Sequence, residues 1–298
     1  MRSSVAWKNH SWVSFEDAQL SLDDWGVVQG VVIVDRLRTC NHRLPDLELH
    51  LNRLKSNCHS IGIAPEGLGF LPEIIDQCAR RNRASFGDQD FGIVVLATPG
   101  ICGTTGPPTI IIHVQRLNWS VLTSWYEGGQ ELVIATARNV PAPCWSPQLK
   151  TRARLHYYLA DRQAANESGK DAGALLLDTH GFVTETSTAS VIVIDEQGRL
   201  CCPPEDAVLG SISLIRTLRL AQSIGLKVVR QPIAPSQLAS AREILLTGTS
   251  GCLWPASKFV DREFPKSTLL PVYLELRDRW IADIGLDYVA QAQLFSHD

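Results

Sequence analysis

The stretch LLLDTHGFVTETSTASVIVI, residues 175–194, decides which kind of fold this chain can form. Its apolar runs are short and closely spaced, and the segment DTHGF at 178–182 supplies a turn between two of them. Strands joined this closely form hairpins, because a parallel pair needs a connection of a dozen or more residues. The stretch therefore favours an α+β fold over a doubly wound parallel sheet.

The residues before 118 predict a separate and smaller unit. In chain order they indicate a long buried strand at 27–39, helices at 46–63 and 71–82, and strands at 91–98 and 109–117. Apolar side chains recur at helical spacing in the first helix, and this stripe consists of Leu47, Leu51, Leu54, Cys58 and Ile61. We expect a small N-terminal α+β domain over 1–117 and a linker at 118–130.

The residues after 130 predict a larger C-terminal domain over 131–298, in which strands outnumber helices. The expected strands lie at 131–138, 174–178, 182–186, 190–195, 227–233 and 243–249. An amphipathic helix over 212–226 interrupts them, and its expected apolar side consists of Ile215, Leu218, Ala221 and Leu226.

Composition excludes several classes of protein. The net charge is -3 and no basic stripe is visible, which argues against nucleic acid as a partner. No run reaches the roughly 18 apolar residues of a membrane span, and the first residues lack the apolar core of a signal peptide. We therefore expect a cytoplasmic protein with no membrane partner. The absence of HExxH, of paired cysteines and of a carboxylate cluster predicts no metal site.

Lysine is scarce in this chain, which has only seven among its 28 basic residues. Lys150 ends a proline-containing loop and precedes a predicted helix in SPQLKTRARLHYYLADRQA, residues 146–164. A lysine amine forms a Schiff base with an aldehyde when burial or nearby cations favour its neutral form. Arg152 and Arg154 lie close enough in sequence to supply such charges. Taken alone, however, a lysine at such a position is more often a solvated loop residue.

Glu185 ends a predicted strand in GFVTETSTAS, residues 181–190. A carboxylate at this place can pair with the ring nitrogen of pyridoxal phosphate (PLP), which must stay protonated. The structural alternative is a surface glutamate on an edge strand.

Three further features are suited to a phosphate group. The turn in AVLGSISLIRTL, residues 207–218, leads into a helix, where the amides of Ile212 and Ser213 have no intrahelical acceptor. Thr249 begins the turn that ends LLTGTSG, residues 245–251, and Arg53 offers a fixed charge on the first helix. Each feature also has an ordinary explanation, as a serine-capped helix, a polar turn or a surface arginine.

In this order, these stretches resemble the class IV aminotransferases, the PLP enzymes of fold type IV. That family includes branched-chain and D-amino acid aminotransferases and aminodeoxychorismate lyase. The stretches that carry the resemblance are DDWGVVQGVVIVDRLRT (23–39), HLNRLKSN (50–57), LKTRARLHYYLADRQA (149–164), LLLDTHGFVTETSTASVIVI (175–194), VLGSIS (208–213) and EILLTGTSGCLWP (243–255). The resemblance implies a small α+β domain, a larger domain with a barrel-like sheet, PLP at their interface, and a homodimer.

The resemblance also implies roles for individual residues. Lys150 would carry PLP as a Schiff base, and Glu185 would meet the pyridine nitrogen. The implied phosphate contacts are Arg53, Ile212, Ser213 and Thr249. The candidate substrate-binding residues are Gln29, Arg38, Arg152, Ser250 and Gly251.

The opening strand departs from the family pattern. Gln29 takes the place of a tyrosine, Val34 the place of a phenylalanine, and Asp35 stands where glutamate is common. The aromatic substrate wall is therefore missing. The arginines at 36, 38, 152 and 154 suit an acidic substrate instead, unless they pair with structural carboxylates.

The expected function is that of a PLP-dependent aminotransferase, which moves an amino group from an amino acid to a 2-oxo acid through Lys150. Two alternatives stay open at this point. One is a PLP-dependent lyase of the aminodeoxychorismate lyase type, and the other is a PLP-binding homologue with little catalytic activity.

Overall fold

The computed structural model describes residues 4–297 of the chain and side chains throughout them except that of Pro65. Its contacts divide the chain into two compact units. The first, the N-terminal unit, consists of the residues up to Leu117 together with Leu149–Ala153. The second, the C-terminal unit, consists of Asn118–Gln148 and the residues from Arg154 onward.

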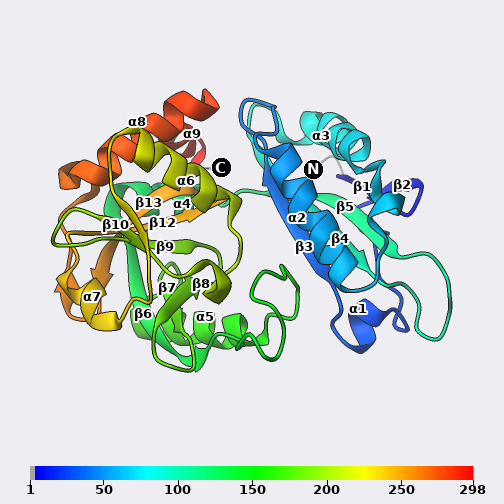
Figure 1. The fold of residues 1–298 in the computed structure, drawn as a ribbon. Helices are drawn as coiled ribbons and strands as arrows, with labels where there is room; N and C mark the ends of the chain where they lie inside the picture. The colour runs from blue at the N-terminus through cyan, green and yellow to red at the C-terminus, as the bar shows by residue number, and fades with distance from the viewer. Residues whose placement is uncertain (1–3, 298) are drawn as a thin grey trace. The chain divides into compact units, whose positions relative to one another are not determined.

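The N-terminal unit is built on an antiparallel sheet with helices packed on one face (Figure 1). Its strands lie in the order β2-β1-β5-β4-β3. Their bounds are β1 (Val5–Lys8), β2 (Ser11–Ser14), β3 (Ile33–Arg38), β4 (Phe91–Thr98) and β5 (Thr109–Arg116). The helical segments are α1 (Trp25–Val28), α2 (Leu47–Ser60), a 3-10 turn (Pro65–Leu68) and α3 (Leu71–Phe86).

Period-two alternation in the strands builds the core of this unit. Ile33 and Leu37 of β3 point to the helices, where they pack with Leu51 and Leu54 of α2. Burying each such side chain contributes about 1.5–3 kcal/mol to folding. The predicted stripe on α2 is confirmed, since three of its members are buried and the other two pack against the same core.

The long strand expected at 27–39 is wrong in its first half. The Asp24 carboxylate accepts a hydrogen bond from the Gly26 amide at 2.7 Å and caps the short helix α1 instead. Gly30 then adopts a φ of +68°, which ends the helix, and β3 starts only at Ile33. The apolar run therefore contributes residues to a short helix, α1, and to a strand, β3.

The C-terminal unit contains a sheet that closes on itself. Pairing runs β9-β12-β13-β6-β7-β8, and β8 pairs again with β9, so these six strands form a barrel-like ring within the described residues. The ring strands are β6 (Gln130–Arg138), β7 (Gly173–Leu177), β8 (Val183–Thr186), β9 (Ser190–Ile194), β12 (Glu243–Gly248) and β13 (Cys252–Phe259). Strands β10 (Leu200–Cys202), β11 (Val228–Arg230) and β14 (Arg262–Glu263) extend it. The predicted α+β class and barrel-like sheet are confirmed.

Helices surround this sheet. They are α4 (Trp119–Gly128), α5 (Leu155–Ser168), α6 (Ile212–Ser223), α7 (Pro235–Ser240), α8 (Pro271–Ile284) and α9 (Tyr288–Phe295), with 3-10 turns at Glu205–Ala207 and Ser267–Leu269. The segment 118–130, expected as a linker, contains α4 and belongs to the C-terminal unit. Along residues 4–297, no helix combines the length and apolar character that a membrane span requires.

The apolar side expected for the helix at 212–226 is wrong at Ile215 and right at Ala221. Ile215 is exposed, and the buried side of α6 carries Leu214, Thr217 and Leu220 together with Ala221. The helix buries Thr217 because its hydroxyl donates to the Ser213 carbonyl at 2.8 Å and lies 3.2 Å from the Thr247 hydroxyl of β12. A threonine whose hydroxyl is hydrogen-bonded therefore takes a core position that the apolar pattern did not include.

Candidate active site

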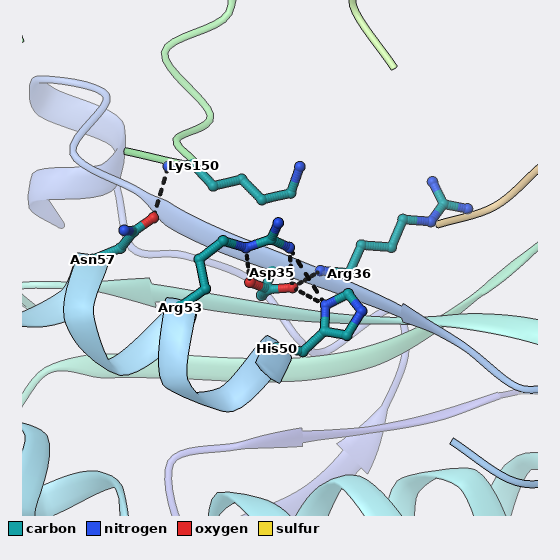
Figure 2. Close-up of polar contacts among 6 residues, drawn as sticks. All are labelled: Asp35, Arg36, His50, Arg53, Asn57 and Lys150. Atoms are coloured by element: carbon teal, nitrogen blue, oxygen red, sulfur yellow. Dashed lines mark hydrogen bonds and ion pairs between the residues drawn. The ribbon is translucent and has the colours of Figure 1, made fainter. Parts of the chain in front are cut away.

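Lys150 lies on a short segment that extends the edge of the N-terminal sheet. Its carbonyl accepts a hydrogen bond from the Val34 amide at 2.9 Å, and its own amide donates to Asn57 Oδ1 at 2.7 Å (Figure 2). Thr151 forms an isolated antiparallel bridge with Ile33. These bonds place Leu149–Ala153 in the N-terminal unit, although the sequence suggested the larger C-terminal domain.

A buried ion pair lies on the α2 side of β3. Arg53 donates from Nε to Asp35 Oδ2 at 2.9 Å and from Nη2 to Asp35 Oδ1 at 2.8 Å. His50 Nδ1 lies 2.7 Å from Asp35 Oδ1, so one carboxylate, itself 1% exposed, holds both side chains (Figure 2). Burial by itself would raise the pKa of Asp35, but the charges and hydrogen bonds of Arg53 and His50 hold it well below its usual range.

Asp35 therefore orients the Arg53 guanidinium without using all of its N–H donors. The pairing uses two of the five N–H donors of the guanidinium, so it does not by itself saturate the group. Arg53 is thus a charge held in one orientation on a helix, as recognition of a phosphate requires.

Glu185 is buried on β8 in the C-terminal unit, with 8% of its surface exposed. The Tyr157 hydroxyl on α5 donates to Glu185 Oε1 at 2.7 Å. Such a bond fixes the orientation of the carboxylate, which suits it to meet a protonated ring nitrogen. Burial, followed by the Glu185 charge, raises the pKa of Tyr157 well above its usual value, so the phenol stays a donor. The structural alternative of a surface glutamate is wrong.

The start of α6 combines a helix cap with the unpaired amides of a helix end. Ser211 is the N-cap, and its hydroxyl accepts a hydrogen bond from the Leu214 amide at 3.2 Å. Ile212 and Ser213 are the first two helical residues, whose amides have no intrahelical acceptor. The capping serine and the suggested anion site are therefore compatible, because the cap engages a different amide.

The loop before Lys150 is bonded to the turn before α6. Gln148 donates from Nε2 to the Val208 carbonyl at 2.9 Å. A Cβ on Gly210 would lie 2.5 Å from Gln148 Oε1, so a larger residue at this position would displace the Gln148 side chain. The residue two positions before Lys150 is thereby attached to the predicted phosphate turn of the C-terminal unit.

The turn Thr249–Gly251 connects β12 and β13. Gly251 is buried, and its carbonyl accepts a hydrogen bond from the Tyr126 hydroxyl at 2.9 Å. A Cβ at this glycine would lie 2.7 Å from the Trp254 ring, so the turn is packed tightly against β13. Thr249 and Ser250 are half-buried.

The remaining sequence candidates lie in different surroundings. Gln29 is an exposed residue that ends α1, whereas Arg38 is 3% exposed on β3 and Arg152 is exposed on the Lys150 segment. Arg154 belongs to the C-terminal unit, where it donates to the Ser187 carbonyl and stacks on the Tyr157 ring at 4.4 Å. Arg154 is therefore a structural residue near Glu185.

Sequence reasoning missed three positioning side chains, namely His50, Asn57 and Tyr157. A signal existed for two of them, because residues 50, 53 and 57 share one face of α2 at spacings of three and four. His50 and Asn57 are polar residues buried on that face. Tyr157 had no such signal, since its bond to Glu185 joins elements far apart in sequence.

The predicted site residues fall into two groups. Lys150 and Arg53 lie in the N-terminal unit, while Glu185, the start of α6 and the Thr249–Gly251 turn lie in the C-terminal unit. The N-terminal unit offers an amine and an oriented guanidinium, and the C-terminal unit offers a helix N-terminus and a buried carboxylate. Each of these is a kind of group that can bind a part of PLP. Within the described part of the chain, no cluster of three or more His, Cys, Asp or Glu side chains could hold a metal ion.

Comparison with known proteins supports the same assignment. Residues 33–259 match the family model described as amino-transferase class IV. A Methanocaldococcus jannaschii protein, "Putative branched-chain-amino-acid aminotransferase", is 28% identical over 91% of this chain and 93% of its own length. The "Branched-chain-amino-acid aminotransferase-like protein 2" of Arabidopsis thaliana is 24% identical, and the match spans about half of it.

Solved structures share the fold. A branched-chain aminotransferase from Thermoproteus uzoniensis, solved with norvaline, superposes with a TM-score of 0.81 at 18% identity, with 95% of each chain covered. The PLP-bound form of a hypothetical aminotransferase from Mycobacterium tuberculosis gives a TM-score of 0.81 at 17% identity, with 94% of this chain and 99% of that chain covered. The family match covers most of the sequence, so this chain belongs to the class IV aminotransferases, enzymes that use pyridoxal 5'-phosphate.

Proposed function

We propose that this class IV aminotransferase transfers an amino group from an amino acid to a 2-oxo acid with Lys150 as its catalytic residue. The observation that carries the proposal is the fixed backbone of Lys150, bonded through its carbonyl to Val34 and through its amide to Asn57. A solvated loop lysine needs no such anchoring, whereas a proton-transferring amine must be held in a defined place.

The cofactor residues follow from the same reasoning. When bound, PLP supplies an electron sink that stabilises negative charge on the substrate α-carbon. Arg53, held by Asp35, and the amides of Ile212 and Ser213 would bind its phosphate, with Thr249 adding a hydroxyl. Glu185, held by Tyr157, would keep the ring nitrogen protonated.

Lys150 has two tasks in this proposal. Its Nζ would be the attachment point of the cofactor. The free amine would take a proton from the α-carbon of the amino acid in the first half-reaction and would deliver a proton to the α-carbon of the new amino acid in the second. The β12–β13 turn at Ser250 and Gly251 would meet the substrate carboxylate through backbone and hydroxyl donors. By family resemblance we propose a homodimer that acts in the cytoplasm.

The attachment residue can be tested by reduction. Borohydride treatment of the purified, PLP-loaded protein should link the cofactor irreversibly to the peptide that contains Lys150, as peptide mass analysis would detect. Lys150→Ala should give no linked peptide, while the matched control Lys170→Ala, at an exposed lysine, should behave as wild type. Linkage at another lysine, or linkage that survives Lys150→Ala, contradicts the proposal.

The phosphate contact is tested by cofactor retention. Arg53→Lys keeps a cation but loses the two-bond geometry, and we expect it to lose PLP faster on dialysis than Arg80→Lys, whose arginine is exposed on α3. Circular dichroism would confirm that both variants are folded. Equal retention in the two variants would remove Arg53 from the phosphate site.

A further inference from the structure

The face of β3 that points away from α2 carries a cluster of cationic side chains. Side chains alternate along a strand, so Asp35 and Leu37 face the helix while Val34, Arg36 and Arg38 share the opposite face. Arg36 is paired across the sheet with Val94 of β4, and Val94 with His113 of β5. We call Arg36, Arg38, His113 and Arg152 the basic face.

Lys150 belongs to this same face of the sheet. The bridge between Ile33 and Thr151 is antiparallel, so Lys150 lies opposite Val34, and residues directly opposite point to the same side. Leu149, one residue earlier, packs into the core on the α2 side, as this alternation requires. Figure 2 agrees, because the side chains of Lys150 and Arg36 extend on one side of the β3 ribbon and His50 lies on the other.

Arg36 is a short distance from Lys150 along this face. It follows Val34 by two residues and is therefore the diagonal neighbour of Lys150, with α-carbons on the order of 7–8 Å apart. Its guanidinium lies close to Gly92, where a Cβ would come within 3.2 Å of both Nε and Nη2. Glycine at this position of β4 makes room for the arginine.

The charged groups that act on Arg36 are cationic. Its Nε is buried and has no hydrogen-bond partner, and among residues 4–297 the side chain forms no ion pair. Burial, followed by the charges of Arg152 and Arg38, lowers the pKa of Arg36 to about 10, and burial together with the charges of Arg152 and Arg36 lowers that of His113. An unmade bond on a charged donor costs free energy, so the arrangement suits an anion that arrives with a ligand.

We propose that Arg36 is the specificity-determining residue of the aminotransferase and that it binds the side-chain carboxylate of a dicarboxylic amino acid or 2-oxo acid. This inference rests on the proposed function of Lys150. A substrate whose α-carbon is at Lys150 would extend its side chain along the basic face to the guanidinium. A branched aliphatic side chain would leave the buried Nε donor of Arg36 without an acceptor, so the enzyme selects against such a substrate.

The test compares two ligands of similar length that differ at one end. Glutarate ends in a second carboxylate, whereas 4-methylvalerate ends in a branched methyl group. With the PLP-loaded enzyme, we expect glutarate to raise the melting temperature and to inhibit competitively at lower concentration than 4-methylvalerate. Arg36→Gln should abolish this preference, and Arg80→Gln, at an exposed arginine of the same unit, should keep it.

Kinetics give the second measurement. For Arg36→Gln, kcat/KM with glutamate as amino donor should fall about 10- to 100-fold relative to wild type, while the value with leucine stays constant or rises. Arg36→Lys, which keeps a charge without the planar fork, should lie in between. An equal loss for glutamate and leucine would overturn the inference, because it would assign Arg36 to the α-carboxylate or to folding.

The outcomes separate this inference from the proposed function. If borohydride links no cofactor to Lys150, the function itself fails. If the cofactor is linked but wild type prefers 4-methylvalerate and leucine, only the role of Arg36 fails. If Arg36→Gln loses PLP on dialysis as Arg53→Lys is expected to, then the anion that it binds is the cofactor phosphate and the inference about substrate is wrong.

Discussion

Asp35 on β3 and Arg53 on α2 form a buried ion pair through two parallel hydrogen bonds of 2.9 and 2.8 Å, and His50 joins it on the same carboxylate. The pair fastens the helix to the edge strand next to which Lys150 lies. Through this pair, one carboxylate positions the proposed phosphate-binding arginine, and its effects are measurable without any substrate.

Removing the carboxylate should destabilise the protein strongly. We expect Asp35→Asn to lower the free energy of unfolding by about 3 kcal/mol, because it leaves the Arg53 charge buried without its partner. Urea denaturation followed by circular dichroism measures the change. The control is Asp76→Asn, which breaks an exposed pair with Arg80 on α3 and should cost less than about 1 kcal/mol. Similar losses of unfolding free energy in the two variants would show that the buried pair stabilises the protein no more than the exposed pair does.

The same pair predicts a pH dependence of stability. Since the pKa of Asp35 lies well below its ordinary value of 3.8 in the folded protein, the carboxylate stabilises the fold above that value. The contribution is lost as pH falls from about 4 toward the lower folded-state pKa. The difference in unfolding free energy between wild type and Asp35→Asn should therefore shrink as the pH falls below about 4. A difference that grows on acidification would contradict the assignment.

Asn57 should act as a positioning residue for Lys150. Asn57→Ala removes the acceptor of the Lys150 amide, and we expect kcat to fall by about 10-fold, with a smaller change in KM, because the amine loses its defined position. Borohydride should still link the cofactor to Lys150 in this variant, which separates positioning from chemistry. Ser56→Ala, at the exposed neighbour on α2, should leave both properties unchanged.

Tyr157 should hold the Glu185 carboxylate in place. Tyr157→Phe deletes the 2.7 Å hydrogen bond and little volume, so we expect the unfolding free energy to fall by about 1–3 kcal/mol and PLP to dissociate faster. Tyr158→Phe is the matched control, since that ring is 59% exposed. Thermal unfolding and cofactor release measured on both variants check the prediction, and identical behaviour would remove Tyr157 from the site.

Elements that carry a helical stripe or that are bounded by strong turn signals were predictable from sequence. The strands expected at 91–98 and 109–117 and the helix expected at 46–63 match β4, β5 and α2 within a few residues. The apolar run at 27–39 was not, because a side-chain cap by Asp24 and a left-handed glycine at position 30 divided it. Local capping and backbone conformation overrode an apolar pattern that had no internal period.

The site divides in the same manner. The sequence by itself determined the types of group available, namely a lysine before a helix, an arginine on one helix face, a glutamate at a strand end and a small-residue turn before α6. The tertiary structure alone decided how they are held: Asp35 on Arg53, Tyr157 on Glu185, and Arg36 on the face of Lys150. Each of these relationships depends on side-chain contacts or on strand register between segments that are distant in sequence. A shift of one residue in register, for example, would turn the Lys150 side chain to the opposite face of the sheet.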